Sequence, residues 1–235
     1  MGNTGSERAN QFVVAIDGPA GAGKSTVAKL AASRLGFSYL DTGAMYRAVT
    51  YKALQQHLSF SDKSALASCA ANSKIEFEDT VNCSAPRVKL DSHDVTDAIR
   101  DPEVSRNVSE VASEPEVRSC MTSLQREIGS RGRWVVDGRD IGTVVFPEAQ
   151  VKIFLTASIE ERAKRRFDEL VSKGYSPVLE ELISEIAKRD GIDSNRKTAP
   201  LKQAENSYYL DTTSLTIDQV VDKIYGIVTV KKGQP

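Results

Sequence analysis

A glycine-rich run that ends in a lysine and a hydroxyl side chain is the first feature of the sequence that could do chemistry. Residues 18–25, GPAGAGKS, match the pattern G-x-x-x-x-G-K-[ST] in full. In such loops backbone N–H groups surround a phosphate, and the following helix adds the positive end of its dipole. Lys24 would reach the β- and γ-phosphates, and the Ser25 hydroxyl can bind Mg²⁺. The run predicts a nucleoside triphosphate site, which a GTPase, a motor or a small-molecule kinase would all carry.

A second group of charged residues follows an apolar run. Residues 137–140, DGRD, come directly after Trp134-Val135-Val136. An acid at such a strand end is typical of a Walker B position, where it reaches Mg²⁺ through water. We therefore expect Asp137 and Ser25 to serve the same ion, with Arg139 and Asp140 on a loop over the site. A plain Asp-Gly turn that closes the strand is the structural alternative.

A third group follows another strand candidate, at residues 37–40. In residues 41–47, DTGAMYR, Asp41 or Thr42 can cap a helix, and the Thr42 hydroxyl can also bind a phosphate. Arg47 lies one turn into that helix, at the end that faces the site. A cap followed by a surface arginine would explain the same spacing.

Arginines also recur on a helix face. Arg162, Arg165 and Arg166 are three and four residues apart, a spacing at which like charges repel by a few tenths of a kcal/mol each. A bound phosphate would reverse that repulsion. The alternative is a solvated basic face, on which Glu161 pairs with Arg165.

The segment 188–196, KRDGIDSNR, reads as the end of a helix continued by a polar loop. Cations are favourable at a helix C-terminus, which would explain Lys188 and Arg189 structurally. Asp193 and Arg196, expected in the loop, have no such explanation. They are therefore candidates for a binding site.

Composition excludes several classes of protein. The 235 residues contain 31 Lys and Arg against 32 Asp and Glu, which argues against a binder of nucleic acid held by bulk charge. The scattered Cys69, Cys83 and Cys120 and two histidines argue against a disulfide framework and a zinc site. The polar N-terminus and the lack of long apolar runs predict a cytoplasmic protein with no membrane segment. We expect a monomer.

Hydrophobic patterns predict an α/β fold in which these groups meet. Short apolar or β-branched runs alternate with helical patterns, which indicates a five-stranded parallel sheet with helices on both faces. Its strands are expected at 12–17, 37–40, 134–137, 151–155 and 207–211. Helix starts are expected at Asp101-Pro102, at a capping box over 113–116, at Ser158, at Ser176-Pro177 and at a capping box over 216–219.

Residues 60–105 differ in character from the rest. A short helix precedes the alternating runs 74–78 and 87–90, which predict small antiparallel strands with one face in water. We expect a small α+β insert here. The expected organisation is a disordered tail at 1–11, a core at 12–59 and 106–230, this insert, and a tail at 231–235.

At these motifs the sequence resembles bacterial cytidylate kinases, a family of P-loop nucleoside monophosphate kinases. The resemblance runs from about Phe12 to Val230, and its most specific stretches are LDTGAMYRAVT at 40–50, VVDGRDIGTVVFPEAQVKIFLTAS at 135–158, RDGIDSNR at 189–196 and LDTTSLTIDQVV at 210–221. It implies a P-loop kinase fold whose insert binds the monophosphate, and a short lid at about 160–190. It also implies ATP, with Mg²⁺, as donor and CMP or dCMP as acceptor.

The resemblance also implies roles for individual residues. ATP would be bound by Gly18, Pro19, Ala20, Gly21, Ala22, Gly23, Lys24, Ser25 and Thr26. The acceptor phosphate would be held by Thr42, Tyr46, Arg47 and Arg139, the cytosine by Ser109, Arg118, Asp140 and Arg196, and the sugar and phosphate side by Arg189 and Asp193. The catalytic set would be Lys24, Arg47, Arg139 and the lid arginines Arg162 and Arg166. The insert and Ser109 match the family pattern less well than the core does.

The hydrogen-bonding groups of cytosine are compatible with these implied roles. A carboxylate such as Asp140 can accept from the exocyclic amine of cytosine, while arginines donate to O2 and N3. Uracil presents an oxygen in place of that amine and would be repelled. A kinase for UMP or a non-nucleotide alcohol, and a P-loop protein that binds ATP without catalysis, remain as alternatives. An alcohol would have no use for the pair Asp140 and Arg196.

Overall fold

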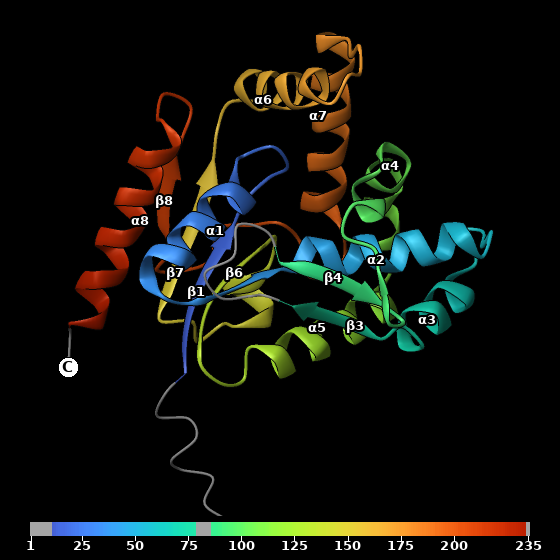
Figure 1. The fold of residues 1–235 in the computed structure, drawn as a ribbon, viewed down its shortest axis with the longest axis horizontal. Helices are drawn as coiled ribbons and strands as arrows, with labels where there is room; N and C mark the ends of the chain where they lie inside the picture. Colours follow the sequence, from blue (N-terminus) through green and yellow to red (C-terminus); the bar gives the residue numbers. More distant parts are fainter. Residues whose placement is uncertain (1–10, 79–85, 234–235) are drawn as a thin grey trace, which may run out of the picture.

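The computed structural model describes residues 11–78 and 86–233. Five strands form a central sheet, in which every neighbouring pair is parallel and the order is β2-β6-β1-β7-β8 (Figure 1). The strands are β1 (Phe12–Asp17), β2 (Ser38–Asp41), β6 (Arg133–Gly138), β7 (Val151–Thr156) and β8 (Tyr208–Asp211). The predicted parallel sheet is thus confirmed, with each strand within one residue of its expected start.

Helices cover both faces of this sheet, also as predicted. α1 (Lys24–Leu35) and α8 (Ile217–Lys232) pack on one face, and α2 (Thr42–Gln55), α4 (Pro102–Val111) and α5 (Pro115–Ile128) lie on the other. Successive β1 side chains enter opposite cores: Val14 and Ile16 pack with α1 and α8, whereas Val13 and Ala15 pack with α2. Because both faces are buried, the strand reads as a continuous apolar run.

The predicted helix starts are partly confirmed. The Asp41, Asp101 and Ser158 side chains cap their helices, and Thr216 and Gln219 form a complete capping box. The capping box expected at 113–116 is wrong. Ser113 donates to the Glu110 carbonyl oxygen at 2.7 Å, so its hydroxyl does not cap α5, which starts at Pro115 instead.

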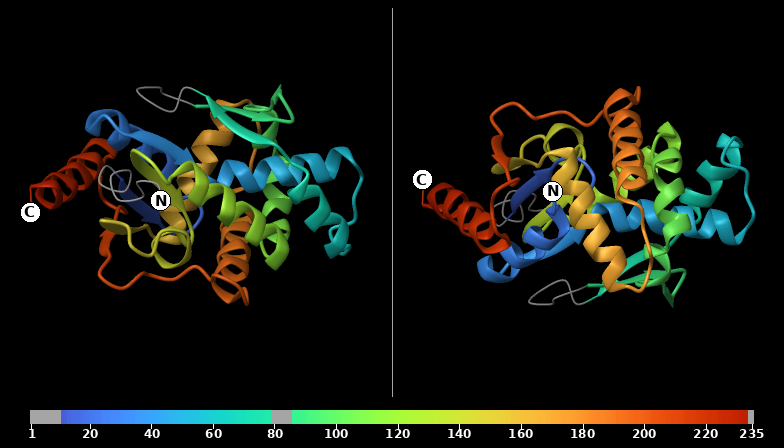
Figure 2. Two further views of the ribbon diagram at one scale, coloured as in Figure 1. Left: turned by 90° about the horizontal axis from the view of Figure 1, so that it is seen from below. Right: turned by 90° about the horizontal axis from the view of Figure 1, so that it is seen from above.

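A second, smaller sheet lies beside α2. β3 (Ile75–Glu78), β4 (Arg87–Leu90) and β5 (His93–Asp94) are antiparallel, as predicted for the alternating runs. α3 (Lys63–Ala71) precedes them and the short helix η2 (Ala98–Arg100) follows. Figure 2 shows this part projecting to the side of the central sheet, away from α8.

Two helices, α6 (Ile159–Ser172) and α7 (Leu179–Asn195), form a hairpin above the sheet. Ala163, Leu182 and Ile186 make a small core between them. Two expectations are wrong here. α7 begins at Leu179 after Val178 rather than at Ser176-Pro177.

The second correction in this hairpin concerns its C-terminal end. The helix continues to Asn195, so the expected polar loop is helical and Lys188 and Arg189 lie inside α7. Tertiary contacts of Asp193 and Asp190 stabilise these last turns against their polar sequence.

The chain ends also differ slightly from expectation. Gln11 donates to the Gly129 carbonyl oxygen at 2.7 Å, so it belongs to the folded part, while the rest of the expected N-terminal tail lies outside the described residues. At the other end α8 extends to Lys232, into the expected C-terminal tail. Within the described ranges no helix is long and apolar enough to cross a membrane.

Candidate active site

The glycine-rich loop joins β1 to α1 at the centre of the sheet. Gly18 passes so close to β7 that an added Cβ would lie 1.9 Å from the Leu155 carbonyl oxygen, so only glycine fits. Gly23 is the left-handed N-cap of α1, with φ 85°, a conformation that glycine adopts without strain. The sequence therefore dictates a tight strand–loop–helix connection whose backbone N–H groups lie at the helix N-terminus.

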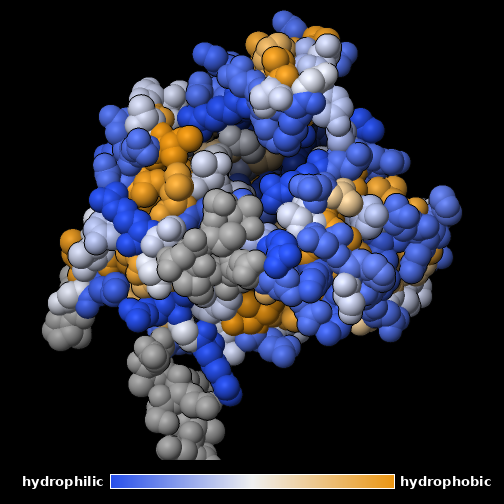
Figure 3. Space-filling model, in the orientation of Figure 1, coloured by the Kyte–Doolittle hydropathy of each residue, from blue (hydrophilic) through white to orange (hydrophobic). Residues whose placement is uncertain are grey.

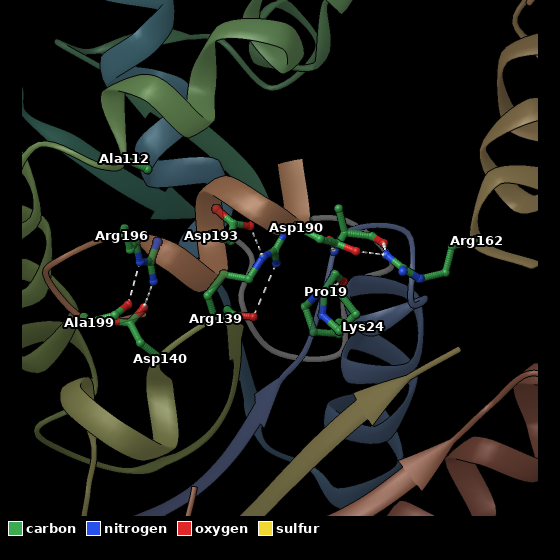
Figure 4. A network of polar contacts seen from close by, with 12 residues as sticks. Pro19, Lys24, Ala112, Arg139, Asp140, Arg162, Asp190, Asp193, Arg196 and Ala199 are labelled. Carbon is green, nitrogen blue, oxygen red and sulfur yellow. Dashed lines mark hydrogen bonds and ion pairs between the residues drawn. The ribbon is translucent and has the colours of Figure 1, made fainter. Parts of the chain in front are cut away.

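Lys24 is held inside this loop. Its Nζ donates to the Pro19 carbonyl oxygen at 2.7 Å, and the side chain is buried (Figure 4). Burial, reinforced by the nearby Arg139 guanidinium, lowers the pKa of Lys24 well below its usual value. An anion in the loop would offset this electrostatic cost.

Asp137 ends β6 opposite Asp41 of β2 and beside the loop. Its Oδ2 accepts from the Ser25 hydroxyl and its Oδ1 from the Tyr39 hydroxyl, both at 2.8 Å. Burial, together with the charge of Asp41, raises the pKa of Asp137 to about 6. A buried carboxylate and an adjacent hydroxyl provide oxygen ligands, which Mg²⁺ prefers.

No cluster of three or more His, Cys, Asp or Glu that could hold a metal ion occurs among residues 11–78 and 86–233. Mg²⁺ normally binds with one or two carboxylates plus phosphate oxygens and water, so such a cluster is not required.

A cationic cluster lies next to the loop. Arg139 Nε donates to Asp193 Oδ2 at 2.8 Å, and Arg189 of α7 is the neighbour of both. Burial and the charge of Arg139 lower the pKa of Arg189 to about 10. Lys24, Arg139 and Arg189 therefore repel one another, while nearby acids, chiefly Asp193, attract them. Three cations this close together can bind a phosphate, which would relieve their mutual repulsion.

A second, more buried cluster is built around Asp140, which lies two residues after the end of β6. Arg118 Nη2 donates to Asp140 Oδ2 at 2.5 Å, and Arg196 Nη2 donates to Oδ1 at 3.3 Å. Arg196 also donates to the Ala199 carbonyl oxygen (Figure 4). Arg118 donates to the Ala112 carbonyl oxygen, so both guanidinium groups are held in place. The carboxylate still has lone pairs that can accept from a ligand.

Thr42 and Arg47 lie in the first turns of α2, next to the end of β6. Thr42 Oγ1 donates to the Asp137 carbonyl oxygen at 2.7 Å, which ties the start of α2 to the end of β6. Arg47 Nη2 pairs with Asp41 Oδ2 at 2.9 Å, but its buried Nε has no hydrogen-bond partner in the part of the chain that the structure describes.

The three α6 arginines have separate environments. Arg162 is buried and donates to the Ala20 carbonyl oxygen and to Asp190. Arg165 pairs with Glu161 at 2.9 Å, as the structural alternative for these arginines expected, and also donates to Thr212. Arg166 pairs with Glu169 and lines a cavity of about 600 Å³ beneath the hairpin, together with Arg100, Asp101 and Tyr175. Figure 3 shows the surface hollowed below α6 and α7.

Comparison with known proteins then identifies the family. A family model described as cytidylate kinase matches residues 14–230. The cytidylate kinase of Geobacillus sp. (strain WCH70) is 52% identical over 224 residues, which cover 95% of this chain and 99% of the relative. This chain belongs to the cytidylate kinase family. The cytidylate kinase of Lactiplantibacillus plantarum is also 52% identical, over 94% of this chain and 96% of the relative.

A solved structure supports the fold alone. An uncharacterised protein from Eubacterium ventriosum superposes with a TM-score of 0.52 at 11% identity, over 95% of this chain and all of the other. The five-stranded parallel sheet, with a phosphate loop at the end of its central strand, is the P-loop kinase fold of the family.

The residues assigned by the family resemblance fall at one edge of the sheet, with two differences from the expected grouping. Tyr46, expected at the acceptor phosphate, lies with its ring 5.4 Å from the Arg118 guanidinium, beside the Asp140 cluster. Arg166 lies away from the phosphate loop, next to Glu169. Ser109 is buried on α4, which packs against α2 and also contacts α7.

Sequence reasoning missed Asp17, Tyr39 and Asp190. Asp17 is buried at the end of β1 and accepts from the backbone N–H groups of Ile141 and Gly142, both at 2.7 Å. It therefore anchors the loop that carries Arg139 and Asp140. Its place directly before the phosphate loop was the available signal. Tyr39 and Asp190 act through contacts with residues far away in the chain, Asp137 and Arg162, which the spacing of residues in the sequence does not reveal.

The burial of Asp17 predicts that the stability of the folded protein depends on pH. Burial raises the pKa of Asp17 from 3.8 to about 6 in the folded chain, so the folded state binds this proton more tightly than the unfolded state does. As the pH falls from 7 to 4, the wild type should gain roughly 2 kcal/mol of stability relative to Asp17→Asn, which is most of the effect of a shift of about two pKa units. Denaturant unfolding of both proteins at each pH measures this difference, and a constant difference would contradict it.

Proposed function

We propose that this protein transfers the γ-phosphoryl group of ATP to the phosphate of CMP or dCMP, giving ADP and CDP or dCDP. The observation that carries this proposal is the position of the buried Arg118–Asp140–Arg196 cluster. Its central residue, Asp140, lies on the loop after β6, and β6 is the neighbour of β1, the strand that leads into the phosphate loop. A site for a base edge thus adjoins a site for a triphosphate.

The donor would be bound by the loop 18–26. Its backbone N–H groups and Lys24 would hold the β- and γ-phosphates. Ser25 and Asp137 would hold Mg²⁺, which neutralises the phosphate oxygens when it is bound. Arg162 and Arg166 of α6 would be directed at the transferring group when the hairpin approaches the loop.

The acceptor phosphate would be held by Thr42, Arg47, Arg139 and Arg189. Its second pKa is near 6, so at pH 7 it is largely a dianion and needs no general base. A phosphate oxygen attacks the γ-phosphorus in line, its bond forms as the bond to ADP breaks, and no protein nucleophile takes part. Catalysis would then consist of positioning and charge neutralisation.

The cytosine would be recognised by the Asp140 cluster. The Asp140 carboxylate would accept from the exocyclic amine, and Arg118 and Arg196 would donate to the acceptor atoms of the base. Uracil would place an oxygen against the carboxylate. A buried polar mismatch of this kind can discriminate by about 10⁴-fold, far more than a missing methyl group.

We also propose a division of labour in the chain. Residues 60–105 would form the insert that closes over the monophosphate, and residues at about 160–190 the lid, which includes most of the α6–α7 hairpin. Closure would exclude water and suppress ATP hydrolysis. We further propose a cytoplasmic monomer whose partners are these small substrates rather than nucleic acid.

The direct test identifies the product. Incubation with ATP, Mg²⁺ and CMP, followed by ion-exchange chromatography, should show CDP and ADP formed in equal amounts. ADP without CDP would indicate ATP hydrolysis instead of transfer. Neither product would leave a nucleotide-binding protein of another kind.

A further inference from the structure

An acid of the α6–α7 hairpin contacts the phosphate loop and has no role in the mechanism described so far. Asp190 Oδ2 accepts from Arg162 Nη1 at 2.6 Å, and Asp190 Oδ1 accepts from the backbone N–H of Ala20 at 3.4 Å. Arg162 Nη1 also donates to the Ala20 carbonyl oxygen at 3.0 Å. Figure 4 shows Asp190 and Arg162 facing each other beside the loop. A carboxylate of α7, an arginine of α6 and one residue of the loop thus form a closed ring of hydrogen bonds.

The loop also packs directly against the first turn of α6 at this point. A Cβ added to Gly21 would lie 3.1 Å from Cβ and 3.3 Å from the carbonyl oxygen of Arg162. The carbonyl oxygen of Ala22 accepts from Arg165 Nη1 at 3.5 Å. Two α6 arginines therefore hold carbonyl oxygens of the loop, so the position of α6 and the conformation of the loop depend on each other.

The peptide between Pro19 and Ala20 connects Asp190 to the lysine of the loop. The N–H of this peptide donates to Asp190, and its carbonyl oxygen, on the opposite side of a trans peptide, accepts from Lys24 Nζ at 2.7 Å. Rotation of this peptide would break both contacts at once. The carboxylate therefore acts on two cations expected at the γ-phosphate, on Arg162 by direct contact and on Lys24 through one peptide.

Arg162 has little freedom to choose another direction. Its side chain is 8% exposed, and Asp190 is its ion-pair partner in the part of the chain that the structure describes. Arg162 Nε donates to the Ala157 carbonyl oxygen at 3.0 Å. Its hydrogen bonds with the described residues thus leave from Nε and Nη1, and Nη2 is left for a phosphate oxygen. Because the guanidinium group is planar, fixing two of its nitrogens also fixes the third.

We infer that Asp190 is a positioning residue for phosphoryl transfer, which sets the direction of Arg162 and keeps Lys24 in place. Asp190 acts through these two cations and not by contact with the phosphates, which its negative charge would repel. Such fixed geometry at the reacting group is what a transfer without a protein nucleophile requires. The inference rests on the proposed function, because it assumes that Arg162 and Lys24 act on the γ-phosphate of ATP.

Asp190→Asn tests this inference in the full chain, since it removes the charge and nearly keeps the shape. We expect kcat to fall about 10- to 100-fold, the value of a hydrogen bond between charged groups, and KM for CMP to stay unchanged. In the background of Arg162→Ala, the same change should lower kcat by at most about 3-fold, because most of its effect passes through that arginine. Glu185→Gln, the same substitution at an exposed acid of α7, is the control and should behave as the wild type.

The other outcomes would overturn the inference. Equal losses of kcat from Asp190→Asn with and without Arg162 would show that the acid does not act through this arginine, and an effect confined to KM for CMP would place it on the acceptor side. A purely structural role would lower Tm and leave kcat unchanged below the unfolding transition. A wild-type protein that forms no CDP would refute the proposed function, and the inference with it, so the wild-type assay separates the two failures.

Discussion

Replacing Arg139 by alanine is expected to lower kcat for phosphoryl transfer about 10³-fold, the range found for arginines that stabilise a transferring phosphoryl group. Arg139 is partly buried and pairs with Asp193, and its charge lowers the pKa of both Lys24 and Arg189. Without it the acceptor phosphate loses a fixed pair of donors where negative charge is concentrated. Steady-state ADP release with saturating ATP and CMP measures the effect.

Two further variants identify the cause of that loss. Arg139→Lys keeps the charge but not the planar fork, so it should recover only part of the rate. Arg106→Ala, on the exposed side of α4, should leave kcat unchanged. Because removing Arg139 leaves Asp193 with fewer partners, Tm is measured for each variant. A folded Arg139→Ala protein with nearly full turnover would contradict the assigned role.

Changing Asp140 to asparagine is expected to remove the preference for CMP over UMP. Asparagine has nearly the shape of aspartate but presents both a donor and an acceptor, so it can meet the uracil oxygen as well as the cytosine amine. We expect kcat/KM for CMP to fall at least about 100-fold and the two substrates to come within about 10-fold of each other.

The same change also removes two buried ion pairs, those of Asp140 with Arg118 and Arg196. Breaking one such pair typically costs about 3–5 kcal/mol of stability, so kinetics are measured below the unfolding transition of the variant. KM for ATP serves as the internal control, since the donor site does not include Asp140. A variant that still discriminated strongly against UMP would contradict the assignment of base recognition to this carboxylate.

The sheet and its helices could be predicted from the sequence because their signals are local. The buried β1 strand, Gly18 in its tight turn and the Thr216–Gln219 capping box each depend on neighbouring residues, and each was found in the expected place. The end of α7 could not be predicted in this way. Its polar residues favour a loop, and only long-range pairs such as Asp193 with Arg139 keep it helical.

The same difference between local and long-range signals decides which parts of the site could be predicted. The proximity of Ser25 and Asp137 followed from their two motifs, which predict that both side chains serve the same ion. The role of Asp17 did not, because its contacts with the N–H groups of Ile141 and Gly142 come from a segment 124 and 125 residues away in the chain. Tyr46 was assigned to the phosphate by motif, whereas the direction of its ring toward Arg118 is a consequence of packing between α2 and α5.

Comparison of five acceptors under identical conditions tests the central claim most directly. ADP release is measured with ATP and Mg²⁺ against CMP, dCMP, UMP, AMP and GMP. We predict high kcat/KM with CMP and dCMP and weak turnover with the other three. Equal turnover with UMP would contradict the proposed reading of cytosine by Asp140, and turnover with none of the five would contradict the proposed reaction itself.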